Sequence, residues 1–340
     1  MKTEMDAALF TGKEITKQSI SSPVIGKGEV LIKVLHAGLC GTDLAIYLGK
    51  MAHRIKPPLV MGHEFCGVIV EKDPSLSINI GQKVIIQPML GCGTCPLCMK
   101  GETQVCLSSR VIGIEQNGGF AEYAVAPIEA VYPVPQEMPS DEAALMEPVA
   151  VAVRGVKQAN VAQGDVVVVL GGGPIGLLLA MAARQAGAEK VYVSEINDYR
   201  LKVANDLGFL TIDAKQRDVE EAILADTNGF GADVVFEAAG TVHTAKQMTR
   251  IIKRQGTILV ISLYKEPAPV DLLAMQNREL TIKSTRAYTH QDFKEAIELV
   301  AQKQFDLAPL ITDRLPLEQL AEGFQRMQVS PTTLKVQIEF

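Results

Sequence analysis

Four cysteines lie close together between residues 92 and 106 and strongly restrict how this part of the chain can fold. They follow the spacing C-x2-C-x2-C-x7-C in the segment GCGTCPLCMKGETQVC, as Cys92, Cys95, Cys98 and Cys106. Thiolates that converge on one tetrahedral ion at about 2.3 Å need tight turns between them, and glycines and a proline supply those turns here. The spacing predicts a closed zinc site in a lobe at 89–107, with a structural role because no position is left for a substrate.

Disulfide bonds and an iron–sulfur cluster fit these cysteines less well than zinc does. Disulfide frameworks are typical of small secreted chains, whereas this chain has 340 residues and its amino terminus lacks the apolar core of a secretory signal. An iron–sulfur cluster uses similar ligands, but the ferredoxin run has a shorter spacing to a last cysteine that precedes proline. Zinc-type cysteine usage therefore predicts a reducing, cytoplasmic environment.

Composition bounds the class of protein. Hydrophobic residues make up 47% of the chain and the net charge is −6, which is compatible with two globular domains and provides no basic footprint for nucleic acid. The stretch from Val166 to Ala183 carries no charge, but three glycines and Pro174 divide it. A buried strand followed by a helix accounts for that stretch better than a membrane span, so we expect neither a nucleic-acid nor a membrane partner.

The pattern of the chain changes near residue 150. From Asp165 onward, short apolar strands alternate with helical stretches, which predicts a doubly wound Rossmann domain with a six-stranded parallel sheet. The segments before Ala150 alternate like antiparallel strands, and the last segment, LKVQIEF, could return to that first β domain. We expect a β domain at 1–150 and 288–340 and a nucleotide-binding domain at 151–287. The expected helices include Val242–Lys253 and, in the tail, Asp292–Ala301.

A glycine motif marks the cofactor site. Gly171, Gly173 and Gly176 form G-x-G-x-x-G between a predicted strand and a predicted helix, where the helix amino terminus attracts a pyrophosphate. Glu195 ends the next strand nineteen residues later, and a carboxylate there binds the ribose hydroxyls of NAD and repels the extra phosphate of NADP. Arg200 could stack on the adenine or contact a 2′-phosphate. The motif favours NAD.

A second metal site is predicted from two glycine-flanked segments. AGLCGTD contains Cys40, and MGHEFCG contains His63 and Glu64. Sulfur, imidazole and carboxylate together suit a zinc ion that keeps one position open for chemistry. Cys40 alone could equally be a small buried hydrophobic residue, and His63–Glu64 an ordinary polar turn.

Together these segments resemble the zinc-dependent medium-chain dehydrogenase/reductase family, the alcohol dehydrogenases. The GHE-x-x-G segment at 62–67, CGTD at 40–43, the four-cysteine lobe and the nucleotide motif occur in the family's order over nearly the whole chain. The segment MEPVAVAV places Glu147 where liver-type enzymes have a third cysteine, as in the sorbitol and polyol dehydrogenase branch. The resemblance implies a GroES-like β domain joined to the Rossmann domain, two zinc ions per chain, and a homodimer or homotetramer.

The resemblance also assigns roles. Cys40, His63 and either Glu64 or Glu147 would hold the catalytic zinc, and Thr42 would begin the proton path. Further positions match cofactor or substrate contacts: Pro174, Ile175, Ile261 and Leu263 for the cofactor, and Tyr47, Phe120 and Tyr288 for the substrate. Ala45 stands where many relatives have a histidine, so the usual imidazole exit for the proton is absent or replaced.

These observations predict an NAD-dependent zinc enzyme that oxidises a small secondary alcohol, a sugar alcohol, related polyol or diol, to a ketone. An L-threonine 3-dehydrogenase is an alternative enzyme, supported by CGTD and the chain length. A non-catalytic nucleotide-binding protein on the same fold is the alternative from another class, but such a protein has no need of an open metal site. The sequence leaves the particular alcohol, and whether it is phosphorylated, undetermined.

Overall fold

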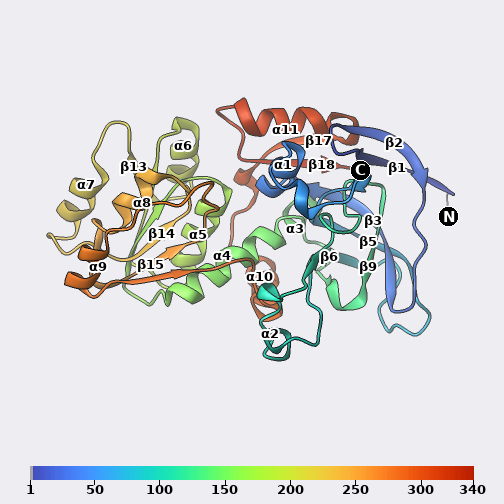
Figure 1. Cartoon of the computed structure of the whole chain (residues 1–340), viewed down its shortest axis with the longest axis horizontal. Helices are drawn as coiled ribbons and strands as arrows, with labels where there is room; N and C mark the ends of the chain where they lie inside the picture. The colour runs from blue at the N-terminus through green and yellow to red at the C-terminus, as the bar shows by residue number, and fades with distance from the viewer. Residues whose placement is uncertain (1–2) are drawn as a thin grey trace. The chain divides into compact units, whose positions relative to one another are not determined.

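The computed structural model describes residues 3–340, which form two compact units (Figure 1). The first unit contains the chain up to Glu147 together with Thr289–Gln302 and Leu307–Phe340, and the second contains Pro148–Tyr288 and Lys303–Asp306. The chain passes from the first unit to the second after Glu147 and returns to the first at Thr289, and the predicted domain limits at 150 and 288 lie near these two points. None of the described helices is long and apolar enough to span a membrane.

The first unit is built mainly from β-sheet. A small sheet has the order β2-β1-β4, and a larger one has the order β10-β6-β5-β3-β18-β17, with β9 also paired to β3. These strands are β1 (Glu4–Phe10), β2 (Ile15–Ser21), β3 (Glu29–Gly38), β4 (Leu59–Val60), β5 (Glu64–Lys72), β6 (Lys83–Ile86), β9 (Tyr123–Pro127), β10 (Val131–Pro133), β17 (Ile311–Pro316) and β18 (Lys335–Glu339). The carboxyl-terminal strand β18 pairs antiparallel with β3, so the tail returns to the first β domain as predicted.

Short elements complete this unit. The strands β7 (Met89–Leu90) and β8 (Arg110–Val111) pair at the base of the cysteine lobe. The helices are α1 (Gly41–Tyr47), α2 (Pro96–Met99), α3 (Ser140–Ala143), α10 (His290–Ala301) and α11 (Leu320–Val329), and α4 (Met146–Ala159) begins here and continues into the second unit. Helix α11 was not predicted, and α10 begins two residues earlier than predicted.

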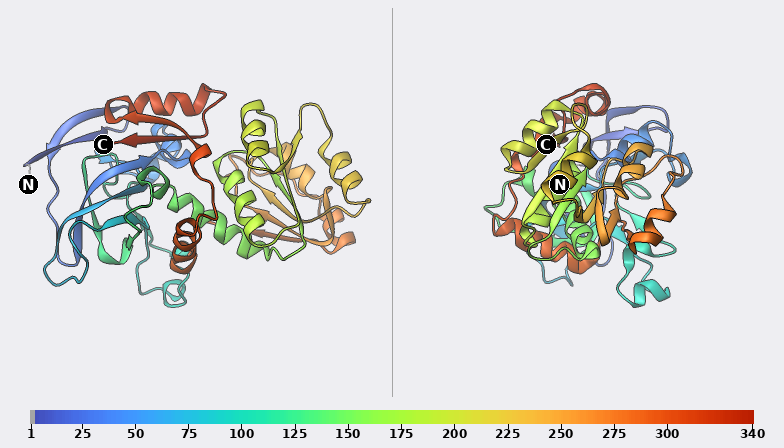
Figure 2. Two further views of the ribbon diagram at one scale, coloured as in Figure 1. Left: turned by 180° about the vertical axis from the view of Figure 1, so that it is seen from behind. Right: turned by 90° about the vertical axis from the view of Figure 1, so that its left-hand side faces the viewer.

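The second unit is a six-stranded parallel sheet of order β13-β12-β11-β14-β15-β16, which confirms the predicted Rossmann topology. Its strands are β11 (Val166–Leu170), β12 (Lys190–Glu195), β13 (Leu210–Asp213), β14 (Ala232–Glu237), β15 (Ile252–Val260) and β16 (Thr281–Ser284). Its helices are the rest of α4, α5 (Pro174–Gln185), α6 (Asp198–Asp206), α7 (Val219–Asp226), α8 (Val242–Met248) and α9 (Leu272–Arg278). Right-handed crossovers from a central starting strand place helices on both faces of the sheet (Figures 1 and 2).

One predicted helix is too long. The sequence analysis extended it from Val242 to Lys253, but α8 ends at Met248 and β15 starts at Ile252. Ile252 pairs with Ala232 at the start of β14, so sheet pairing overrides the helical propensity of the last predicted turn. The apolar stretch after Val166 forms a buried strand, β11, and a buried helix, α5, as predicted.

Candidate metal centres and nucleotide crevice

Cys40, His63 and Glu64 come together in the first unit. One ligand atom from each side chain lies within 4.8 Å of the others. Cys40 follows the end of β3 and precedes α1, while His63 directly precedes β5 and Glu64 begins it. The antiparallel pairing of β3 with β5 joins the two segments, because Gly38 is the register partner of Glu64.

Gly38 makes this close approach possible. A Cβ atom at Gly38 would lie 2.4 Å from Glu64 Oε2 and 3.0 Å from Lys335 Cε. Gly62 plays a similar part before His63, since its φ is +93° and a Cβ there would lie 2.7 Å from the ring of Phe120. The two glycines therefore let the side chains that carry the chemistry meet without backbone strain.

Asp43 orients two of the three ligands, Cys40 and His63. It is fully buried, its Oδ2 accepts a hydrogen bond from the Cys40 amide at 2.9 Å, and its Oδ1 lies 3.3 Å from His63 Nδ1. Burial alone would lower the pKa of His63, but Asp43 and Cys40 raise that pKa well above its ordinary value. A carboxylate on one imidazole nitrogen leaves the other free for a metal ion, the usual arrangement around a zinc-bound histidine.

Lys335 is a buried charged residue beside this cluster that was not predicted from the sequence. It begins β18, its exposed fraction is only 4%, and its ammonium group forms an ion pair with the buried carboxylate of Glu64. Burial would lower the pKa of Lys335, yet Glu64, Cys40 and Glu147 together raise it. The alternating segment LKVQIEF gave no signal of this burial, because alternation predicts that one side of the strand faces solvent.

This donor set fits a zinc ion that retains an open position. It offers one soft sulfur, one imidazole and one carboxylate, and His63 and Glu64 are both buried. The environment also favours positive charge, as the pKa values of His63 and Lys335 show. Glu147, in the first turn of α4, is outside this group of three among the described residues, so its part in metal binding stays a prediction.

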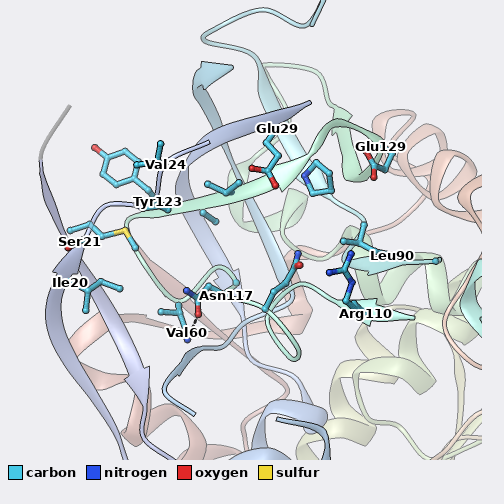
Figure 3. A pocket seen from close by; sticks show the side chains of 18 residues that line it. Ile20, Ser21, Val24, Glu29, Val60, Leu90, Arg110, Asn117, Tyr123 and Glu129 are labelled. Atoms are coloured by element: carbon cyan, nitrogen blue, oxygen red, sulfur yellow. Dashed lines mark hydrogen bonds between the residues drawn. The ribbon is translucent and has the colours of Figure 1, made fainter. Parts of the chain in front are cut away.

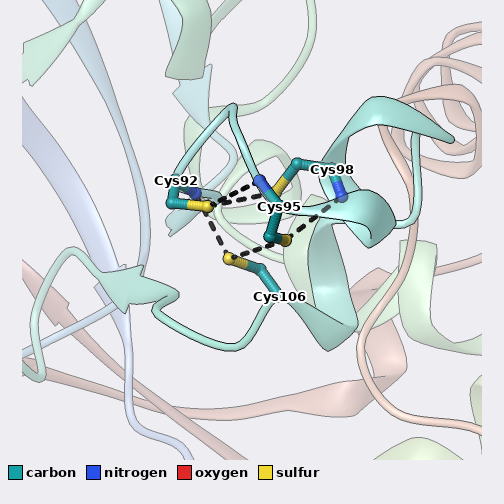
Figure 4. A group of neighbouring side chains, drawn as sticks. All are labelled: Cys92, Cys95, Cys98 and Cys106. Carbon is teal, nitrogen blue, oxygen red and sulfur yellow. Dashed lines mark hydrogen bonds between the residues drawn. The ribbon is translucent and has the colours of Figure 1, made fainter.

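The four lobe cysteines form a second group of metal ligands (Figure 4). The Sγ atoms of Cys92 and Cys98 are 3.9 Å apart, and those of Cys95 and Cys106 are 3.8 Å apart. Sulfurs at the corners of a tetrahedron, each about 2.3 Å from a central zinc, would be separated by about 3.8 Å. The lobe thus has the dimensions of a closed four-thiolate zinc site.

Local backbone groups prepare the lobe for metal. The amides of Cys95 and Cys98 donate to the preceding cysteine sulfurs at 3.3 and 3.5 Å. Hydrogen bonds from the amide and hydroxyl of Thr94, and from the Cys95 amide, lower the pKa of Cys92 to about 6. Desolvation, with neighbouring thiols, raises the pKa of Cys98 to about 12. A divalent cation bound to all four sulfurs would favour the thiolate form of each of them.

The glycine motif forms one side of a crevice in the second unit. A cavity of about 500 Å³ lies at the carboxyl ends of the parallel strands. Its lining combines residues of the glycine turn, the end of β12 and the segment after β14: Gly171, Gly173, Ser194, Glu195, Ile196, Arg200, Ala214, Ala238, Ala239, Thr241, His243, Thr244 and Gln247. The crevice lies between the segments that follow the neighbouring strands β11 and β14, at the point where the strand order reverses, and doubly wound sheets bind nucleotides at such a point.

The predicted roles of the glycines match their surroundings. Gly171 has φ +108°, and a Cβ on Gly176 would lie 1.8 Å from the carbonyl oxygen of Gly171, so α5 packs directly on the turn. Pro174 and Ile175 are the first residues of α5, where proline suits a helix start.

Glu195 lies in the wall of the crevice beside this turn. Its carboxylate accepts amide hydrogen bonds from Gly172 at 2.8 Å and Ile196 at 2.7 Å. Arg200 Nη1 lies 3.7 Å from the same carboxylate.

The other predicted site residues are placed as follows. Thr42 is half-buried at the start of α1, next to Cys40. Ile261 directly follows β15, and Leu263 is 79% exposed. The predicted substrate residues are more enclosed: Tyr47 stacks on Phe324 with ring centroids 4.9 Å apart, and Phe120 and Tyr288 are fully buried. Their contact with substrate stays a prediction.

A further hollow opens on the first unit (Figure 3). Its volume is about 490 Å³, and its lining includes Val24, Arg110, Tyr123 and Glu129. None of the three clustered metal ligands lines it. We therefore assign the chemistry to the Cys40 cluster and not to this hollow.

A β unit with two metal-ligand clusters and a doubly wound nucleotide-binding unit define a metal-dependent dehydrogenase. Residues 26–136 match the family model "Alcohol dehydrogenase GroES-like domain", and residues 174–302 match "Zinc-binding dehydrogenase". The chain belongs to the zinc-containing medium-chain alcohol dehydrogenase family. It is a zinc-dependent NAD(P) dehydrogenase with a structural four-cysteine site and a catalytic Cys/His/Glu site, and it acts on alcohol-type substrates.

Relatives with assigned activities cover most of the chain. It is 36% identical to 2-dehydro-3-deoxy-L-galactonate 5-dehydrogenase of Pseudoalteromonas atlantica over 92% of each chain. It is 34% identical to L-threonine 3-dehydrogenase of Bacillus subtilis over 90% of each chain. These two proteins act on different alcohols, so relatedness alone does not determine the substrate.

Solved structures match the whole chain. A zinc-binding dehydrogenase of Sinorhizobium meliloti bound to NADP has a TM-score of 0.95 and 31% identity, with full coverage of both chains. An alcohol dehydrogenase of Escherichia coli CFT073 complexed with NADH has a TM-score of 0.93 and 27% identity, also with full coverage. Similar proteins thus bind either nicotinamide cofactor.

Proposed function

We propose that this enzyme oxidises a secondary alcohol of a small polyhydroxylated compound, a sugar alcohol, related polyol or diol, to a ketone with NAD. The products are the ketone, NADH and one proton. The observation that carries the proposal is the cluster of Cys40 with the buried His63 and Glu64, whose ligand atoms lie within 4.8 Å of one another. The 36% identity to an enzyme named for a sugar acid supports a polyhydroxylated substrate and adds sugar acids to the candidates.

The residues divide the work as follows. Cys40, His63 and Glu64 would hold the zinc ion, with Glu147 or water completing the site. When bound, zinc supplies Lewis acidity that lowers the pKa of a contacting hydroxyl, and the nicotinamide supplies a hydride acceptor. Thr42 would relay the proton of the substrate hydroxyl: its oxygen accepts that proton as its own hydroxyl proton passes to a ribose hydroxyl of the cofactor, so the threonine stays neutral. Since Ala45 offers no imidazole, water would receive the proton from there.

NAD is the proposed cofactor. The Glu195 carboxylate lies in the wall of the crevice, where it would accept ribose hydroxyls and repel a 2′-phosphate. Arg200, 3.7 Å from that carboxylate, weakens the repulsion, so we expect a preference and not an absolute restriction. Titrating the protein with NADH and NADPH tests this: equal dissociation constants would contradict it.

A panel of alcohols tests the reaction. NADH formation would be measured with sorbitol, galactitol, 2,3-butanediol, an L-galactonate-type sugar acid and L-threonine. We expect the highest kcat/KM with a polyhydroxylated compound or diol. L-Threonine is the second candidate, favoured by the 34% identity to a threonine dehydrogenase, and it would replace the first if it gave the highest value.

We also propose a homo-oligomer, a dimer or tetramer. Strand β16 lies at an edge of the parallel sheet, and Leu272 and Leu273, which begin the preceding helix α9, are 71% and 68% exposed. An open sheet edge and exposed apolar residues are each typical of an interface. Light scattering of the purified enzyme that gave a monomer mass would exclude this.

A further inference from the structure

Glu237 is a fully buried glutamate that the reaction does not use. It is the last residue of β14, with an exposed fraction of 0%. Its register partners are Leu170 on β11 and Val260 on β15, so it lies at the carboxyl edge of the sheet beside the nucleotide crevice. A carboxylate is costly to bury, so its partners indicate why the chain keeps it there.

Neutral groups satisfy the Glu237 carboxylate. Oε1 accepts hydrogen bonds from the amides of Ala239 at 3.1 Å and Gly240 at 2.9 Å, and from the hydroxyl of Thr244 at 2.7 Å. Oε2 accepts a hydrogen bond from the hydroxyl of Ser262. No lysine or arginine among the described residues forms an ion pair with it within 4.0 Å. The negative charge strengthens all four hydrogen bonds; an apolar side chain could accept none of them, and a neutral amide would accept them more weakly.

The donors belong to the walls of the crevice. Ala239 and Thr244 line the cavity, and both come from the segment that follows β14. Ser262 lies beyond β15, and its backbone amide also donates to the Glu237 carbonyl oxygen at 3.2 Å. The same segment meets the glycine turn, because a Cβ on Gly171 would lie 3.1 Å from the Ala239 amide nitrogen. One carboxylate therefore joins the ends of two strands and the wall that faces the glycine turn.

We propose that Glu237 is a positioning residue for the nucleotide cofactor: it clamps the segments after β14 and β15 and so fixes the shape of the crevice. The proposal rests on the proposed function, in which this crevice holds NAD. The variant Glu237→Gln keeps the size of the side chain but turns an acceptor into a donor. The Ser262 hydroxyl can rotate to accept from the new amide, but the remaining hydrogen bonds lose the negative charge that strengthens them and hold the wall less firmly.

The test compares cofactor binding with the rest of the enzyme. For Glu237→Gln we expect the NADH dissociation constant and the KM for NAD to rise about tenfold or more, with the KM for the alcohol changed less than twofold and two zinc ions retained. Glu189→Gln, the same change at an exposed position of the same unit, is the matched control and should match the wild type. Binding is measured well below the melting temperature, so reduced stability alone would leave it unchanged.

Two further variants keep the test decisive if Glu237→Gln does not fold. Ser262→Ala and Thr244→Val each remove one donor, and each should raise the NADH dissociation constant about threefold to fivefold. Wild-type NADH affinity in Glu237→Gln, or in both donor variants, would overturn the proposal. A wild-type protein that binds no NADH would instead refute the proposed function.

Discussion

The two metal-ligand clusters are built in opposite ways. All four ligands of the lobe lie within fifteen residues, three of them at least partly exposed, and amides of the same loop donate to their sulfurs. The Cys40 cluster takes its ligands from the end of β3 and the start of β5, and its balancing charge from a third strand, β18, far along the chain. Among the described residues, the hydrogen bonds to the lobe sulfurs come from neutral backbone amides and a threonine hydroxyl, whereas the Cys40 cluster has Asp43 on one side and Lys335 on the other.

This difference shows what each site needs from the fold. A four-thiolate site needs a loop of the right spacing, and the metal then holds that loop together. An open site needs ligands that stay in place when one position is empty, so its supporting groups must be fixed by the sheet. We therefore expect changes at the buried cluster to affect turnover, and changes at the lobe to affect stability.

The largest expected effect is on turnover at the buried cluster. Cys40→Ser removes its only sulfur ligand, and we expect kcat/KM to fall by about a thousandfold or more, equivalent to about 4 kcal/mol of transition-state stabilisation. Elemental analysis should find one zinc per chain in place of two, with NADH binding unchanged. Full activity with one zinc would show that the lobe, and not this cluster, does the chemistry.

At the lobe, Cys98→Ser should lower the stability of the protein and leave turnover unchanged. Zinc present at a hundredfold excess over its dissociation constant stabilises a site by about 2.7 kcal/mol, and losing that would lower the melting temperature by about 5–10 °C. The remaining active fraction should keep the wild-type kcat. Differential scanning fluorimetry with metal analysis checks this, and a variant with unchanged Tm but lost turnover would break the distinction between the sites.

The lobe was also the easier site to predict from sequence. Its ligand spacing is local, and so is the glycine turn between β11 and α5, which is why both were found. Lys335 was missed because LKVQIEF alternates, which suggests one apolar face and one solvent face. In the structure β18 lies between β3 and β17, and Lys335 through Ile338 are all buried. Only the sheet order, which no local pattern carries, reveals that both faces are covered.

Two helix predictions were wrong for a related reason, contacts between segments that are distant in the sequence. The end of α8 is set by the pairing of β15 with β14, and α11 packs against β17 and β18 from the tail of the chain. Long-range contacts decided both, whereas α5 was predicted correctly from its own proline and glycine signals.

Lys335→Met tests whether the buried cluster depends on its balancing charge. Leaving the Glu64 carboxylate buried without its cation should destabilise the zinc-free protein by about 3–5 kcal/mol, and zinc should restore part of that. The Tm difference between zinc-loaded and zinc-free protein should therefore be larger than in the wild type.

We also expect kcat of Lys335→Met to fall about 10–100-fold, since supporting residues of metal sites have effects of that size. Lys13→Met, at an exposed position, is the control; an unchanged Tm difference would show that Lys335 is a bystander.

The smallest expected effect is the pH dependence of the lobe, measured in the Cys40→Ser variant so that only the lobe binds zinc. The pKa of Cys92 is lowered from 9.0 to about 6 by its hydrogen bonds. A thiol with a lowered pKa contributes stability that is complete above its ordinary pKa of 9.0 and is lost as the pH falls towards 6. Below about pH 6 this thiol must also lose its proton before it can bind zinc, so zinc affinity should fall more steeply there, by an additional factor of about ten per pH unit. Competition with a coloured chelator between about pH 5 and 8 measures this, and a single slope across the range would show that the backbone donors around Cys92 do not prepare the thiolate.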